Sequence, residues 1–190
     1  MATFSGRYVI APGYQDSEDG HWQSLWQADF GTAAVRMSVR SWDEPEFEDW
    51  VSALEAAMTP GAIIVAHSLG CLTAIAWLGR HPGVAAGAFL VAVPDPEGPN
   101  FPGSITGFSR PTERAADPVL MVGSSNDPVA EWDFTLATAA VIGAPLVALG
   151  PAQHISTEAG FGPWPEGRAL LAGFVAGLPH HPTCQNHGGP

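Results

Sequence analysis

The chain has 190 residues, of which 46% are apolar and 14% are charged, and this balance favours a folded domain with a sizeable core. Its formal net charge of −12 argues against nucleic acid or an anionic membrane as a partner, because both attract a basic surface. All seven basic residues are arginine, and without lysine the chain cannot form a Schiff base, attach pyridoxal phosphate or build a Walker-type phosphate site.

The predicted elements alternate along the chain. Short apolar runs with the composition of buried parallel strands lie at residues 7–11, 33–38, 62–66, 87–93, 118–123 and 145–149. Helices are predicted at residues 21–28, 46–58, 69–80, 132–142 and 166–178. This alternation predicts a single three-layer α/β domain over residues 1–178, with a doubly wound sheet of about six mostly parallel strands and helices on both faces. Ligands are expected at the carboxyl ends of the strands.

Two segments of the chain are irregular. Residues 94–117 are rich in proline and glycine and are expected to form a surface loop at the edge of the site. Residues 179–190 are polar and lack periodicity, so they are expected to form a disordered tail. Three histidines and Cys184 lie in this tail, but disorder is favoured over a metal site because nothing else there fixes a ligand geometry.

The sequence also bears on location and cofactors. No apolar run approaches the roughly 18 residues needed to cross a bilayer, and the first residues lack the layout of a signal peptide. A cytoplasmic location is therefore expected. Cys71 and Cys184 are the only cysteines and predict neither a disulfide framework nor a metal site. We expect no metal and no cofactor.

The most informative motif follows the third predicted strand. Ser68 stands between an apolar run and a predicted helix, with the small residues Ala66 and Gly70 two positions away on either side. A sharp strand-to-helix turn exposes a serine hydroxyl as a nucleophile, and small residues are needed where strand and helix nearly touch. The ordinary alternative is a serine that only caps the helix. The acidic residue and histidine found further along the chain favour the nucleophile.

A serine nucleophile needs a general base and an acid that orients this base, and in this fold class the chain order is serine, acid, histidine. His154 follows the last predicted strand and Asp127 follows the strand before it. Both therefore emerge at the sheet edge where Ser68 lies. Asp95 follows an earlier strand and is an alternative acid. Two further aspartates are less well placed, namely Asp117 and Asp133.

The remaining site residues are predicted from their place in the chain. The backbone N–H of Leu69 and one from the loop near Gly13 and Tyr14 are expected to form the oxyanion hole. The candidates for substrate contact are Gly13, His21, Trp22, Trp42, His67 and Trp164. Core packing is the alternative for the tryptophans, and a structural hydrogen bond is favoured for His21. His67 points away from its neighbour Ser68 and is not expected to be the base.

Several short motifs, taken together in their order along the chain, are much more specific than the Ser68 motif alone. The sequence resembles the small serine hydrolases related to the retinoblastoma-binding-protein serine hydrolase, over roughly Tyr8 to Leu178. The segments that carry the resemblance are Ala66-His67-Ser68-Leu69-Gly70-Cys71, Asn126-Asp127-Pro128, Gly150-x-x-x-His154-Ile155 and Gly160-x-Gly162-x-Trp164-Pro165. The resemblance implies a compact α/β-hydrolase fold without a cap domain. It carries the nucleophile onto Ser68, the acid onto Asp127 and the base onto His154.

The function expected from these residues is hydrolysis of a small ester, thioester or activated amide through an acyl-enzyme. Two alternatives stay open. The first is a non-catalytic or weakly catalytic module that binds a protein partner, because a fold does not guarantee turnover. The second is an acyltransferase, whose first half-reaction is identical to that of a hydrolase. The physiological substrate and the oligomeric state do not follow from the sequence.

Overall fold

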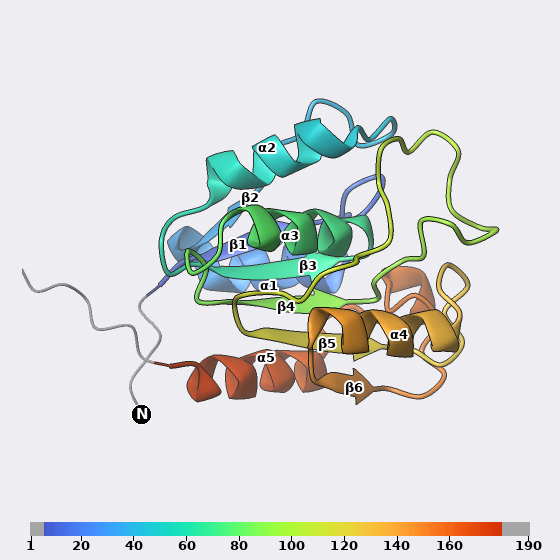
Figure 1. Cartoon of the computed structure of the whole chain (residues 1–190). Helices are drawn as coiled ribbons and strands as arrows, with labels where there is room; N and C mark the ends of the chain where they lie inside the picture. The colour runs from blue at the N-terminus through green and yellow to red at the C-terminus, as the bar shows by residue number, and fades with distance from the viewer. Residues whose placement is uncertain (1–5, 180–190) are drawn as a thin grey trace, which may run out of the picture.

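The computed structural model describes residues 6–179, and within them one parallel sheet forms the middle layer (Figure 1). Its strands lie in the order β2-β1-β3-β4-β5-β6, and every neighbouring pair is parallel. The strands are β1 (Tyr8–Ala11), β2 (Ala34–Arg36), β3 (Ile63–His67), β4 (Gly87–Val91), β5 (Val119–Gly123) and β6 (Leu146–Ala148). The order reverses between β1 and β3, which makes the crevice at their carboxyl ends the favoured place for a ligand.

Helices cover both faces of this sheet (Figure 1). They are α1 (Trp22–Phe30), α2 (Phe47–Ala57), α3 (Leu69–Arg80), α4 (Trp132–Ile142) and α5 (Pro165–Gly177), with short 3-10 helices at Gly31–Ala33 and Thr157–Ala159. Residues of α2, α3 and α4 share one buried apolar cluster, and residues of α1 and α5 share the other. The predicted three-layer, doubly wound α/β fold is confirmed.

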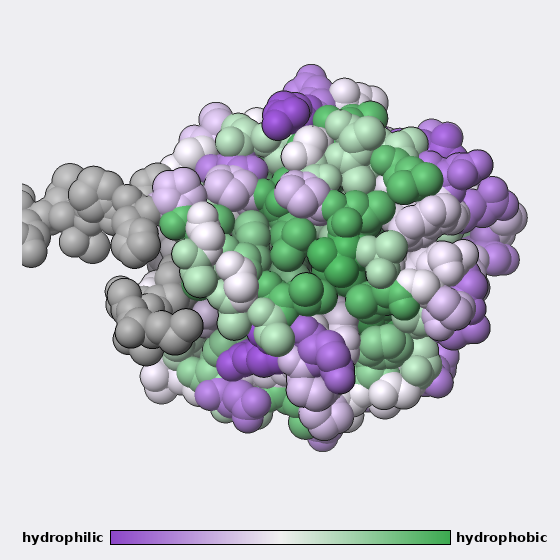
Figure 2. All heavy atoms as spheres, turned by 90° about the horizontal axis from the view of Figure 1, so that it is seen from below, coloured by the Kyte–Doolittle hydropathy of each residue, from purple (hydrophilic) through white to green (hydrophobic). Residues whose placement is uncertain are grey.

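Burial on both faces of the sheet explains why the central strands are continuous apolar runs in the sequence. In β3, Ile64 packs into the cluster on one face, while Ile63 and Val65 pack into the cluster on the other. All residues of β3 and β4 are buried. A strand covered by helices on both sides must be apolar on both sides. The edge strand β6 has no buried residue, and the surface around β6 and α5 shows a gathering of apolar side chains (Figure 2).

The structure shortens three of the predicted strands by two or more residues. The strand predicted at residues 87–93 ends at Val91, because Ala92 adopts a left-handed backbone with φ of 54°, which departs from the extended conformation of a strand. At the two sheet edges the pairing stops early, so the predicted ranges 33–38 and 145–149 shrink to three residues each. The first helix begins one residue later than predicted, because His21 is its N-cap and accepts from the Gln23 N–H.

The irregular segment 94–117 connects three parts of the site edge. Thr106 makes two main-chain hydrogen bonds near the start of α2, donating to Pro45 and accepting from Phe47. The Asn100 amide donates to the Pro128 carbonyl, and Ser104 contacts the Tyr14 hydroxyl at 3.4 Å. The loop therefore spans from the segment after β5 to the segment after β1. The predicted disordered tail, from residue 180 onward, lies outside the described residues.

Among the described residues, no helix is both long enough and apolar enough to span a membrane.

Candidate active site

Ser68 occupies the turn between β3 and α3, and this turn is strained. Its φ of 50° and ψ of −124° lie outside the regions that most residues adopt. Two glycines allow the turn to exist. A Cβ on Gly70 would lie 2.1 Å from the Ala11 carbonyl oxygen, and a Cβ on Gly13 would lie 2.8 Å from the Ser68 Cβ. Strand, helix and the loop after β1 thus meet around Ser68 without side chains between them.

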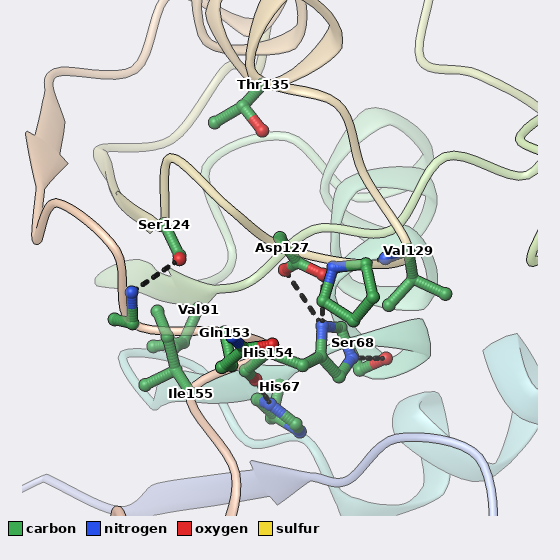
Figure 3. Close-up of polar contacts among 12 residues, drawn as sticks. His67, Ser68, Val91, Ser124, Asp127, Val129, Thr135, Gln153, His154 and Ile155 are labelled. Carbon is green, nitrogen blue, oxygen red and sulfur yellow. Dashed lines mark hydrogen bonds and ion pairs between the residues drawn. The ribbon is translucent and has the colours of Figure 1, made fainter. Parts of the chain in front are cut away.

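Ser68, His154 and Asp127 form a continuous row of contacts (Figure 3). The His154 Nε2 lies 2.8 Å from the Ser68 Oγ, and its Nδ1 lies 2.8 and 2.9 Å from the two Asp127 carboxylate oxygens. Because a carboxylate only accepts, Nδ1 carries the hydrogen and Nε2 offers its lone pair to the serine hydroxyl. This is the arrangement in which an imidazole can take a proton from a serine.

The side chains of Asp127 and His154 differ in their exposure. The Asp127 side chain is only 2% exposed, and one of its oxygens also accepts from the Val129 N–H at 2.9 Å. The His154 side chain is 20% exposed, so its imidazole remains reachable. A buried carboxylate with fixed donors can hold the imidazole in one orientation and stabilise its positive charge.

The alternative acid, Asp95, is occupied elsewhere. The Arg110 guanidinium donates to both of its oxygens, at 2.8 and 2.6 Å, and the Glu97 N–H donates at 3.0 Å. This pairing with Arg110 holds the pKa of Asp95 below its ordinary range. Asp117 accepts from the Gly83 N–H. The structure thus brings Asp127, and not Asp95, to His154.

Two polar residues that sequence reasoning missed fix the segment that carries His154. Ser124 Oγ accepts from the Ala152 N–H at 2.9 Å, and Asn126 Oδ1 accepts from the Gln153 N–H at 2.8 Å. Ser124 also donates to Asn126 within the loop after β5, and the bonds to Ala152 and Gln153 join this loop to the one after β6. The only signal in the sequence is the position of Ser124 and Asn126 beside Asp127, and short polar residues are common in any turn.

The predicted oxyanion donors lie on both sides of Ser68. Leu69 is the first residue of α3, where a helix leaves its N–H groups without an intrahelical partner. Within the described part of the chain, the Tyr14 N–H makes no hydrogen bond to a protein acceptor. Gly13 approaches Ser68 closely enough to bring this loop to the nucleophile. Within the described residues, neither of these two amides is therefore held by a protein acceptor.

Most of the side chains predicted to contact substrate are buried, which differs from the expectation. Trp22 is 0% exposed and Trp164 is 5% exposed, because both pack with Trp26 between α1 and α5. His21 and His67 are 3% and 5% exposed. Trp42 is half-buried and packs edge-on against Trp50. Of the six predicted residues, Trp42 is the one whose side chain keeps an accessible surface.

Burial also sets the protonation of nearby groups. It lowers the pKa of His21 to about 4 and that of His67 well below its ordinary value. Both imidazoles are therefore neutral near neutral pH. Burial raises the pKa of the Cys71 thiol, which makes this residue a poor nucleophile. Among the described residues, no group of three or more His, Cys, Asp or Glu is placed to hold a metal ion.

A surface hollow of about 600 Å³ lies between the start of β5 and the end of α5. Its lining includes Pro118, Gly143 and Phe174, and none of the predicted site residues. Because the triad lies at the opposite ends of the strands, this hollow is separate from the candidate active site.

Solved structures share this fold. A protein described as a YdeN-like hydrolase from Pectobacterium atrosepticum is 32% identical, with a TM-score of 0.79 over 91% of this chain and 92% of that one. The ydeN gene product from B. subtilis is 21% identical, with a TM-score of 0.72 over 90% and 100%. MGS-M2, an α/β hydrolase from a deep-sea metagenome library, is 13% identical, with a TM-score of 0.69 over 95% and 93%. The fold is that of the α/β hydrolases.

The sequence also assigns the chain to one family within the α/β-hydrolase fold. A family model described as serine hydrolase matches residues 8–173, which is most of the chain. The chain belongs to this serine hydrolase family. A comparison with curated proteins gave no match.

Proposed function

We propose that the protein cleaves a small ester, thioester or activated amide through an acyl-enzyme, with Ser68 as nucleophile, His154 as general base and Asp127 as the orienting acid. The observation that carries this proposal is the unbroken row from the Asp127 carboxylate through both ring nitrogens of His154 to the Ser68 hydroxyl, with contacts of 2.8 Å. Membership of the serine hydrolase family supports the same chemistry.

In the first half-reaction, the Ser68 Oγ attacks the carbonyl carbon of the substrate and its proton passes to the His154 Nε2. The carbonyl oxygen becomes an oxyanion, which the N–H groups of Leu69 and Tyr14 stabilise. Removing one such donor typically costs about 3 kcal/mol of transition-state stabilisation. The Asp127 carboxylate stabilises the imidazolium that forms beside it.

The tetrahedral intermediate then breaks the bond to the leaving group, which takes the proton back from His154 and departs. An ester of Ser68 remains. In the second half-reaction, His154 takes a proton from a water molecule as its oxygen attacks this ester. Collapse of the second intermediate releases the carboxylic acid and returns the proton to Ser68, so the enzyme is unchanged.

The surroundings of the site favour a modest apolar acyl group. The half-buried side chains of Tyr14 and Trp42 pack at the edge of the apolar cluster near β1, and the loop 94–117 adds Phe101 and Ile105 to that cluster. The hydrogen bond between Ser104 and Tyr14 brings this loop to the proposed oxyanion loop. Because the chain is strongly acidic, anionic substrates gain no long-range attraction.

The proposal is tested by intact-mass analysis after treatment with a fluorophosphonate, which reacts with activated serines. One adduct is expected on the wild-type protein and none on Ser68→Ala. A panel of p-nitrophenyl esters and acyl thioesters of increasing chain length then defines the substrate class. A folded wild-type protein that takes up no adduct would contradict the proposal and favour a binding module.

A further inference from the structure

His67 is a buried histidine that the proposed mechanism does not use. It is the last residue of β3, directly before Ser68, and its side chain turns away from the nucleophile (Figure 3). The His67 Nε2 lies 2.9 Å from the main-chain carbonyl oxygen of His154. A carbonyl oxygen only accepts, so Nε2 must carry the hydrogen of the neutral ring. One end of β3 therefore contacts His154 twice, through the Ser68 side chain and through the His67 side chain.

The segment around His154 needs such a contact because its backbone is strained. Gln153 and Ile155, on either side of the base, both have φ of 50°. This left-handed conformation is unfavourable for any residue other than glycine, and most of all for a β-branched one such as Ile155. A strained backbone persists only where the surrounding structure holds it.

Four side chains from other elements hold this segment. On one side, Ser124 and Asn126 bind the main-chain N–H groups that precede His154. On the other side, the main-chain carbonyls are bound: His67 donates to the carbonyl of His154, and the Trp22 indole N–H donates to that of Ile155 at 3.0 Å. Of these four side chains, His67 is the one bonded to the base residue itself.

We propose that His67 is a positioning residue that fixes the main chain of the catalytic base and thereby sets the distance between His154 and Ser68. This inference rests on the proposed function. His67 touches neither the substrate nor the reacting atoms, so its effect passes through His154. A displacement of about 1 Å in a reacting group can cost about 100-fold in rate, so even a small movement of this segment is measurable.

The environment keeps this donor in place. The titratable groups that face the His67 ring are His21 and His154, whose ring centroids lie 4.8 and 5.0 Å away. Burial and both of these neighbours lower the pKa of His67. The ring therefore stays neutral while His154 gains and loses its proton. With one hydrogen on Nε2, it donates to the same carbonyl throughout the cycle.

The test compares three substitutions at this position. His67→Gln can place an amide N–H near the position of Nε2, whereas His67→Asn has the same group on a side chain that is one methylene too short. His67→Leu fills a similar volume with no donor. The rate constant of fluorophosphonate labelling at Ser68 is measured for each, with kcat and KM for an ester that the wild type hydrolyses.

The expected result is a loss of about 10-fold or more in labelling rate and kcat for His67→Asn and His67→Leu, with KM nearly unchanged. His67→Gln should recover most of the rate. Leu54→Ala is the matched control, because it removes buried apolar volume from α2 and lowers stability without approaching the triad. Its labelling rate should equal that of the wild type while it is folded.

The possible outcomes distinguish a failure of the role proposed for His67 from a failure of the proposed function. A labelled wild type with His67→Asn labelled equally fast would overturn the role of His67 and leave the proposed function intact. A wild type that is not labelled would overturn the proposed function and, with it, any role of His67 in positioning a base. If His67→Leu does not fold, the comparison of Gln with Asn still decides. Histidine ¹⁵N NMR gives an independent readout, since a ring protonated only at Nδ1 would exclude the hydrogen bond to His154.

Discussion

Asp127 contacts both the His154 imidazole and the main chain of its own loop, and a neutral amide can replace the carboxylate as acceptor in the second contact. Replacing Asp127 with Asn keeps an acceptor for the Val129 N–H but removes the negative charge beside the His154 imidazole. We expect kcat to fall by up to about 10⁴-fold, the loss typical when the orienting acid of a serine triad is neutralised. The melting temperature should change little.

The control for this substitution is Asp95→Asn, which removes the charge of one of the two carboxylates that pair with Arg110 and leaves the other, Glu97, in place. This change should leave the triad in place and lower kcat far less. Steady-state kinetics of both variants on one ester decides between the two acids. If Asp95→Asn loses the activity and Asp127→Asn keeps it, the assignment of the acid is wrong.

A second expectation at the residue scale concerns the effect of low pH on the reactivity of Ser68. The Ser68 hydroxyl can pass its proton to the His154 Nε2 only while that nitrogen holds a lone pair, so a protonated imidazole cannot act as base. The labelling rate is therefore expected to be lower in acidic than in neutral solution. Labelling by a fluorophosphonate over a pH series measures this. A rate that stays flat from neutral into acidic solution, in protein that is still folded, excludes His154 as the base.

At the scale of secondary structure elements, the contact between β1 and α3 is the tightest in the site. A Cβ on Gly70 would meet the Ala11 carbonyl oxygen at 2.1 Å and that of Pro12 at 2.5 Å, and backbone cannot move aside cheaply. We expect Gly70→Ala to lower the free energy of unfolding by at least about 3 kcal/mol, the upper range for single substitutions. Urea denaturation measures this loss.

The same helix supplies a matched control. Gly79 lies in α3 near its end, and a Cβ there would meet nothing within 4 Å. Gly79→Ala is therefore expected to stabilise the protein by about 0.5–1 kcal/mol, because alanine loses less conformational freedom in a helix than glycine. Equal effects of the two substitutions would show that helix propensity, and not the close approach to β1, decides the outcome.

The elements differ in how far the sequence predicts them. The central strands and α3 follow from local patterns, since a run buried on both faces is apolar throughout. The early end of β4 does not, because the left-handed backbone of Ala92 is imposed by its surroundings and not by alanine itself. The pairing of Asp95 with Arg110 also lies beyond prediction, because both residues flank or occupy a loop without periodicity.

The candidate site, too, follows from the sequence only in part. The chain order of serine, acid and histidine after the third, fifth and sixth strands places the triad residues at one sheet edge without knowledge of any contact. Which side chains line that edge depends on how α1 and α5 cover the sheet. Trp22 is buried by that packing, so its indole N–H anchors the Ile155 carbonyl instead of meeting a substrate. The sequence alone does not distinguish a tryptophan that anchors a main-chain carbonyl from one that contacts a substrate.

At the scale of the whole molecule, the two buried histidines link stability to pH. Burial holds the pKa of His21 at about 4 and that of His67 well below 6.5, whereas in the unfolded chain both return to about 6.5. Below pH 6.5 the unfolded state therefore binds more protons than the folded state. The free energy of unfolding is expected to decrease as the pH falls from about 6.5 toward 4, by up to about 1.4 kcal/mol per pH unit for each histidine.

Denaturation curves at several pH values measure this slope, and His21→Asn isolates one part of it. Asparagine can still accept from the Gln23 N–H at the start of α1 but does not titrate. The variant is expected to lose stability less steeply in acid than the wild type. An unchanged slope would show that His21 is not neutral in the folded protein.

The strand order also has a consequence for how the protein matures. Ser68 and His154 are 86 residues apart in sequence and meet only when β3, β4, β5 and β6 lie side by side. Such long-range pairings form late, after the cost of closing large loops has been met. If Ser68 and His154 act as proposed, a newly made chain whose last strand has not docked should have a Ser68 hydroxyl that is not activated. On the proposed mechanism, labelling at Ser68 would therefore follow completion of the sheet, and a partly folded chain would not be acylated by esters.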